Sequence, residues 1–251
     1  MGTLPDNEII SLIVRLLAAH LLADFYLQPT SWVLDKKKHN WASSGMLKHL
    51  MVIATISWIF SGFVTGIWLI PIAIFVLVHW LTDSWKSSRQ ETSLLFISDQ
   101  LIHILTIVLI VYIFKNNKIQ TLFPLYSQFS DTHFWIIFSG FLLVAHPVSH
   151  LIYLFTRQFQ KNLDNREEPG LANAGKTIGI LERWLILIFI LINQFNAVGF
   201  LIAAKSILRF ADIRNAPDRK MAEYILIGTM MSFLFAIIIG ITINYLYKFE
   251  Y

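Results

Sequence analysis

The 251-residue chain contains no cysteine. This absence excludes disulfides, thiolate metal sites and cysteine nucleophiles, so any metal must be held by His, Asp or Glu. Charge is also scarce: only 14% of the residues are Asp, Glu, Lys or Arg, against about 25% in an average soluble domain. Hydrophobic residues make up 56% of the chain, and the mean hydropathy is +0.60. This composition indicates a protein whose main solvent is lipid.

The sequence also lacks a basic stripe interleaved with aromatic residues, which a nucleic-acid-binding surface would need. The net charge of +4 is better explained by the excess of Lys and Arg in the cytoplasmic loops of membrane proteins. The first apolar run has no basic region before it and contains Arg15, His20 and Asp24. We therefore interpret it as a retained helix instead of a signal peptide. The expected partner is the lipid bilayer, and no nucleic acid.

Apolar segments recur along the whole chain, and a membrane-spanning helix needs about 20 mostly apolar residues. The pattern predicts an all-α, polytopic transmembrane helix bundle that forms a single integral membrane domain over residues 1–251. We expect about eight helices, or about seven crossings if 197–211 is re-entrant. The expected helices cover 8–27, 48–64, 67–83, 97–114, 134–156, 178–195, 197–211 and 223–247.

The basic residues between these helices predict their orientation. They concentrate in segments 35–48, 84–96, 157–177 and 212–222. If 197–211 crosses the membrane, all of these segments lie on one side. Because cytoplasmic loops are enriched in Lys and Arg, this arrangement favours about eight crossings with both chain ends outside the cytoplasm. The expected location is therefore a cell membrane, with the chain as a multi-pass protein.

Ionisable residues recur inside the expected helices, where they are energetically expensive and point to a function. Most come in His and Asp pairs four residues apart, a spacing that places both side chains on one helix face. Such a pair can bind a divalent cation, and imidazole with carboxylate suits zinc, manganese or iron better than magnesium or calcium. The candidate ligands are His20, Asp24, His49, His79, Asp83, Asp99 and His103.

Under the expected topology, all these ligands lie at a similar depth on the cytoplasmic side. Glu182, Arg183, Lys205 and Arg209 fall at a similar depth in the C-terminal half. Glu182 could act as a general acid or base. Arg183, Lys205 and Arg209 could bind the phosphate of a substrate. The shared depth predicts one polar site on the cytoplasmic side.

Several segments resemble a known family. HLLADFYLQ, HWLTDSWK and SDQLIH, together with His49, resemble the bacterial membrane family labelled domain-of-unknown-function 3307. GKTIGILERW, GFLIAAKSILRF and AEYILIGTMMS resemble the extended form of that family. The resemblance implies a multi-pass protein of the bacterial inner membrane with no established activity, so no catalytic residue is carried over. A looser likeness to membrane-bound metal-dependent hydrolases differs in the order of the motifs.

Three functions follow from these observations. The leading hypothesis is a metal-dependent membrane hydrolase that acts on a lipid or phospho-substrate. The alternatives are a proton- or ion-coupled transporter, in which His and Asp form a relay, and a non-catalytic membrane assembly protein. Whether the protein is an enzyme stays open at this stage. The convergence of the candidate ligands in space is the discriminating observation, because a metal site requires it.

Overall fold

The computed structural model describes residues 6–117, 119, 131–160, 174–214 and 219–249. Among these residues no β-strand occurs, and the ordered elements are α-helices and two short 3-10 helices. This confirms the predicted all-α class. The chain divides into two compact units, Met1–Ser139 and Gly140–Tyr251, which are described separately. The prediction of one membrane domain stays a prediction.

Each predicted helix is present, with shifted ends. The helices are α1 (Asp6–Phe25), α3 (Ser44–Phe60), α4 (Leu69–Ser87), α5 (Ser93–Phe114), α6 (Thr132–Gln160), α7 (Ala174–Leu191), α8 (Phe195–Arg214) and α9 (Arg219–Phe249). One further helix, α2 (Thr30–His39), occupies part of the segment expected to be a basic loop, so that expectation was wrong. Pro29 precedes α2 with φ −64°, which suits a helix start, and lysine is a good helix former.

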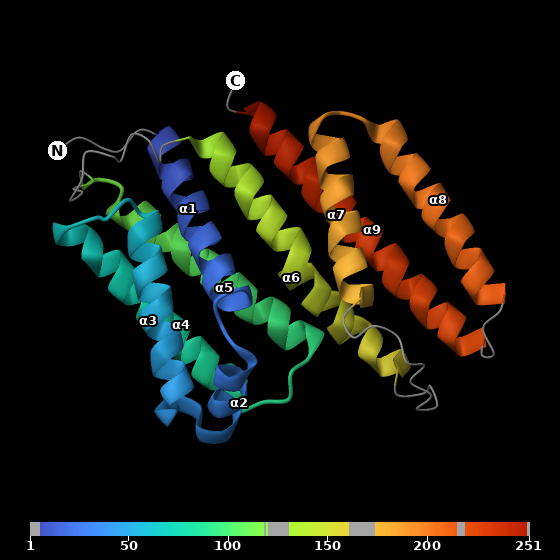
Figure 1. Cartoon of the computed structure of the whole chain (residues 1–251). Coiled ribbons are helices and arrows are strands. Elements are labelled where there is room, and N and C mark those ends of the chain that lie inside the picture. Colours follow the sequence, from blue (N-terminus) through green and yellow to red (C-terminus); the bar gives the residue numbers. More distant parts are fainter. Residues whose placement is uncertain (1–5, 118, 120–130, 161–173, 215–218, 250–251) are drawn as a thin grey trace. The chain divides into compact units, whose positions relative to one another are not determined.

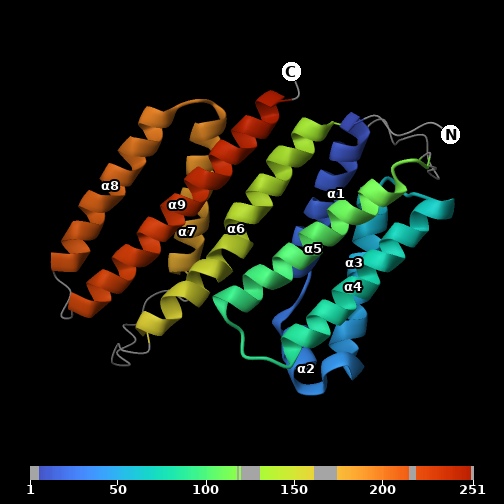
Figure 2. The ribbon, with the colours of Figure 1, turned by 180° about the vertical axis from the view of Figure 1, so that it is seen from behind.

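The first unit is built around α1, α3, α4 and α5, which pack against one another in a ring and are coloured blue to green in Figure 1. Helix α1 packs against α3 and α5, and α4 packs against the same two helices. The view from behind shows α4 and α5 side by side (Figure 2). The apolar core of this bundle includes Leu12 of α1, Ile53 of α3, Phe75 of α4 and Ile107 of α5. The polar side chains gather in another layer, where α1 and α4 end and α3 and α5 begin.

Local capping signals fix where two of these helices begin. The Ser43 hydroxyl accepts a hydrogen bond from the Met46 amide at 3.0 Å, and the Thr92 hydroxyl accepts one from the Leu95 amide at 3.1 Å. Such caps satisfy amides that would otherwise lack a partner, and each contributes about 1 kcal/mol. They therefore set the helical register of His49 on α3 and of Asp99 on α5.

Among the described residues, four helices are long and apolar enough to cross a membrane. They are Gly66–Ser87, Ser93–Phe114, Thr132–Phe159 and Glu223–Tyr247. Glu8–Phe25 and Thr30–Ala42 form a fifth candidate only as a pair, bent by 82°. These lengths and compositions indicate a membrane protein. The number of crossings and the orientation stay predictions.

The second unit contains residues 140–160 of α6 together with α7, α8 and α9. Helices α7 and α9 pack closely, and Ile190, Val198 and Phe233 contribute to a shared apolar core. A Cβ atom at Gly240 would lie 2.8 Å from Ile190 Cδ1. Glycine at this position therefore permits the close approach of the two helices.

Candidate metal centre

The predicted ligands come together in one cluster within the first unit. They project from the ends of α1 and α4 and from the beginnings of α3 and α5. Three groups of ligand atoms each lie within 4.8 Å of one another. The groups are His20, Asp24 and His79; His49, His79 and Asp83; and Asp83, Asp99 and His103.

The spacing of four residues works as the sequence suggests, because it places both members of a pair on one helix face. On α1, His20 Nδ1 lies 3.7 Å from Asp24 Oδ1. On α4, His79 Nε2 lies 3.7 Å from Asp83 Oδ2. On α5, His103 Nε2 lies 3.2 Å from Asp99 Oδ1. Each helix thus supplies a ready-made pair, and the bundle joins the pairs.

The tightest part of the cluster is centred on two imidazoles. His49 Nε2 and His79 Nε2 are 3.0 Å apart. Asp24 Oδ1 lies 3.3 Å from His49 Nε2 and 3.5 Å from His79 Nε2. Asp83 Oδ2 lies 3.7 Å from each of the two nitrogens. A tetrahedral zinc site with bonds of 2.0–2.2 Å separates its ligand atoms by about 3.3–3.6 Å. The two distances from Asp24 fall within this range, whereas the 3.0 Å between the imidazole nitrogens lies below it and the 3.7 Å to Asp83 lies slightly above it.

Residues of α5 contact the histidines of α1 and α4. The rings of His79 and His103 stack with centroids 4.1 Å apart. His20 Nε2 lies 3.2 Å from Gln100 Oε1, and Gln100 also donates to Asp99 Oδ2 at 3.1 Å. Contacts of this kind orient metal ligands. Gln100 was not among the predicted site residues, although it directly follows a predicted ligand.

Several ligand atoms in the cluster are buried without a hydrogen-bond partner in the described part of the chain. They are the Nδ1 atoms of His20, His49, His79 and His103. Buried polar groups are normally paired, and leaving one unpaired costs about 1–3 kcal/mol. A bound cation would compensate those atoms that face it. A cation at the Nε2 atoms of His49 and His79 would not face the Nδ1 atoms of the same rings, so the fit to a metal depends on the distances and on the imidazole and carboxylate donors.

Two lysines donate hydrogen bonds to carboxylates of the cluster, and neither lysine was predicted to be part of the site. Lys36 of α2 donates to Asp83 Oδ2, and Lys86 of α4 donates to Asp99 Oδ2 at 2.7 Å. Three ionised carboxylates and two ammonium groups leave the cluster with one net negative charge. A protonated imidazole would neutralise it, whereas a divalent cation would turn it into a site with one net positive charge.

The cluster reaches the protein surface at its carboxylates. The side chains of Asp24 and Asp83 are 11% and 10% exposed, and that of Lys86 is 25% exposed. The imidazoles of His20, His49, His79 and His103 are at most 1% exposed. A ligand would therefore enter from the side of Asp24 and Asp83, because the histidines are covered.

The part of the chain that contains the cluster matches a known family. Residues 12–130 match the family described as a protein of unknown function, DUF3307. Over these residues, called the DUF3307 region below, the chain is similar to that family. The match confirms the resemblance seen in the N-terminal motifs and contains all the candidate ligands and both lysines. Searches among curated proteins and among solved structures found no match.

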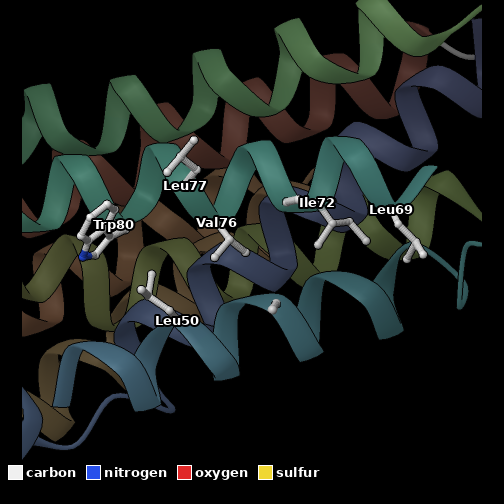
Figure 3. Close-up of a pocket in the computed structure, with 8 residues that line it drawn as sticks. Leu50, Leu69, Ile72, Val76, Leu77 and Trp80 are labelled. Atoms are coloured by element: carbon white, nitrogen blue, oxygen red, sulfur yellow. The ribbon is translucent and has the colours of Figure 1, made fainter. Parts of the chain in front are cut away.

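The DUF3307 region also carries an apolar groove between α3 and α4 (Figure 3). Its volume is about 440 Å³, and it is lined by Leu50, Ala54, Leu69, Ile72, Ala73, Val76, Leu77 and Trp80. No candidate ligand lines the groove. Two of the lining residues, Leu50 and Trp80, directly follow the cluster histidines of α3 and α4 in the sequence. One end of the groove therefore lies at the depth of the cluster.

Outside the DUF3307 region, the other predicted site residues lie in the second unit. Glu182 of α7 forms an ion pair with Lys205 of α8. The buried Arg183 donates to the carbonyls of Val144 and Ala145 and to two serine hydroxyls. Arg209 falls in α8, but its side chain lies outside the described residues. These contacts tie α6, α7, α8 and α9 together, and the predicted roles in catalysis and substrate binding stay predictions.

Proposed function

We propose that this protein is a metal-dependent membrane hydrolase whose metal site lies in the DUF3307 region. The observation that carries the proposal is the approach of Asp24, His49 and His79 to one another at 3.0–3.5 Å. Asp83 stands beside them as the fourth candidate ligand. Three helices supply these groups, so the arrangement exists only in the folded bundle.

The ligand chemistry favours zinc, manganese or iron, because imidazole nitrogen and carboxylate oxygen suit these ions. A divalent ion in this position would polarise a phosphoryl or carbonyl oxygen and acidify a bound water. The stacked ring of His103 restricts the His79 imidazole, and Asp99 in turn orients His103.

The substrate class we propose is a lipid or a phosphate-bearing compound reached from the cytoplasmic side of a bacterial inner membrane. The net positive charge of the cluster with one divalent ion is complementary to an anion. The apolar groove beside the cluster is suited to an acyl chain, which supports a lipid substrate (Figure 3).

A proton- or ion-coupled transporter is the second candidate. The hydrogen-bond distance of 3.0 Å between the His49 and His79 nitrogens is what a proton relay needs. Transport also requires polar groups along the whole path. The described interior of the bundle is instead filled by apolar residues such as Leu12, Phe75 and Ile107. This core favours the hydrolase over the transporter.

The deciding experiment is the metal content of the purified protein after a chelator wash, measured by mass spectrometry. We expect close to one zinc, manganese or iron ion per chain in the wild type. His79→Ala should lose the ion while its helical content is retained. His39→Ala is the matched control, because that imidazole is 51% exposed and outside the cluster. A well-folded wild type without metal would contradict the proposed function.

A further inference from the structure

Three consecutive lysines, Lys36, Lys37 and Lys38, lie on the short helix α2. Only Lys36 is buried, with 5% of its surface exposed, while the two lysines that follow it are exposed. Consecutive helical residues point in directions about 100° apart. Helix α2 therefore turns one lysine of the three toward the cluster and leaves the others outside.

The Lys36 ammonium lies beside the proposed metal position. It donates to Asp83 Oδ2, and the same oxygen is 3.7 Å from the Nε2 atoms of His49 and His79. A lysine ammonium has three donors. Asp83 is its hydrogen-bond acceptor within the described part of the chain, so further donors remain for a ligand that enters beside Asp83.

A network of contacts holds α2 in this orientation. The carboxylate of Asp35 accepts hydrogen bonds from Ser43 Oγ at 2.6 Å, the Gly45 amide at 2.8 Å and His39 Nδ1 at 2.8 Å. A Cβ atom at Gly45 would lie 2.8 Å from the Trp32 carbonyl oxygen, so α2 lies directly on the start of α3. The helix that carries Lys36 is thereby locked against the helix that carries His49.

The second cluster lysine is placed differently. Lys86 pairs with Asp99 and lies over the ring of Phe96, 5.5 Å from its centroid. It is also the more exposed of the two lysine side chains. Lys36 is therefore the ammonium that shares an Asp83 oxygen with His49 and His79, whereas Lys86 lies on the side of Asp99.

We propose that Lys36 binds the phosphate group of the substrate, next to the metal of the proposed site. This assignment rests on the proposed function, because it takes the metal to lie at His49 and His79. One divalent ion gives the cluster a net positive charge, and Lys36 supplies that charge as hydrogen-bond donors. The phosphate belongs either to a lipid headgroup or to a soluble compound.

The test compares binding of radiolabelled inorganic phosphate by the full-length protein in nanodiscs, together with its metal content. Lys36→Met should keep the metal and weaken phosphate binding on the order of tenfold to a hundredfold, as expected for loss of a charge-assisted hydrogen bond. Lys36→Arg, which keeps the charge, should bind more tightly than Lys36→Met. Lys37→Met and Lys38→Met, on the same helix, should match the wild type.

Two results would overturn the assignment. Unchanged phosphate binding in a metal-replete Lys36→Met protein would refute the role of Lys36 and leave the metal site intact. Loss of metal together with phosphate would instead reduce Lys36 to a structural partner of Asp83. A wild type without metal would contradict the proposed function itself, so the two failures are distinguishable.

A second variant covers the case in which Lys36→Met does not fold. Asp35→Asn leaves Lys36 in place but weakens the contacts that orient α2. It should weaken phosphate binding and keep the metal, and unchanged phosphate affinity in this variant would then overturn the proposal.

To identify the source of the phosphate, the wild-type measurement is repeated in phosphatidylcholine nanodiscs with and without phosphatidic acid. Competition by phosphatidic acid would support a lipid headgroup, whereas its absence alongside Lys36-dependent phosphate binding would support a soluble compound.

Discussion

At the residue scale, the cluster is a set of buried charges that hold one another in place. Asp99 is the clearest case, because it is fully buried and pairs with Lys86 while its other oxygen faces His103. A buried ion pair contributes little net stability, but removing one partner leaves an uncompensated charge in a site of low dielectric. The variants of greatest interest therefore change one charge at a time.

We expect Asp99→Asn to destabilise the protein by about 3–5 kcal/mol, because the Lys86 ammonium then loses its buried partner. The value should fall toward the lower end, since the Lys86 side chain is 25% exposed and partly screened by solvent. Thermal unfolding in detergent measures the effect. In the double variant Lys86→Met, Asp99→Asn, part of the lost stability should return. Equal stability of the single and double variants would show that the pair is not coupled.

At the element scale, α2 decides which groups the site contains. It is too short and polar to be a membrane span by itself, and it follows α1 across a bend of 82°. Its attachment to α3 depends on Asp35. The Ser43 hydroxyl, the Gly45 amide and His39 all lower the pKa of the Asp35 carboxyl below its usual range.

This lowered pKa predicts how the attachment of α2 depends on pH. Because the folded-state pKa of Asp35 lies below its ordinary value, the stabilisation is fully present above about pH 4 and is lost as the pH falls below that value. Hydrogen exchange of the α2 amides should therefore speed up relative to α5 as the pH falls below about 4. In Asp35→Asn this additional pH dependence should be absent. Identical pH profiles in the two proteins would contradict the role of Asp35.

At the scale of the whole molecule, the open question is which ends of the helices face the cytoplasm. The cluster lies where α1 and α4 end and where α3 and α5 begin, and the basic segment 35–48 is at the same end of this unit. The positive-inside rule predicts that this end faces the cytoplasm. The natural absence of cysteine makes the chain suitable for labelling at single introduced cysteines.

We expect Lys37→Cys, on the exposed face of α2, to react with a membrane-impermeant maleimide in inverted inner-membrane vesicles and not in intact spheroplasts. Thr65→Cys, in the turn between α3 and α4, should show the opposite pattern. The two sites lie in the same unit, so each serves as the control for the other. The reverse labelling pattern would place the metal cluster on the outer side and contradict the cytoplasmic assignment.

Much of the architecture could be predicted from the sequence, because the signals for it are local. Long apolar runs identified the helices, and the spacing of four residues put His20 with Asp24 and His79 with Asp83 on single helix faces. The scarcity of charge made each of these pairs conspicuous. Even their shared depth followed from counting residues from the helix ends.

The all-α class, the helices and the pool of His and Asp candidate ligands could thus be predicted from the sequence. The three-dimensional packing was needed to show that α2 is a helix, that Lys36 faces Asp83 and that the His49 and His79 nitrogens are 3.0 Å apart. It also showed that Arg183 bonds to carbonyls of α6. These facts depend on how each helix is rotated against its neighbours. That rotation is decided by packing between residues distant in the chain, which no local pattern records.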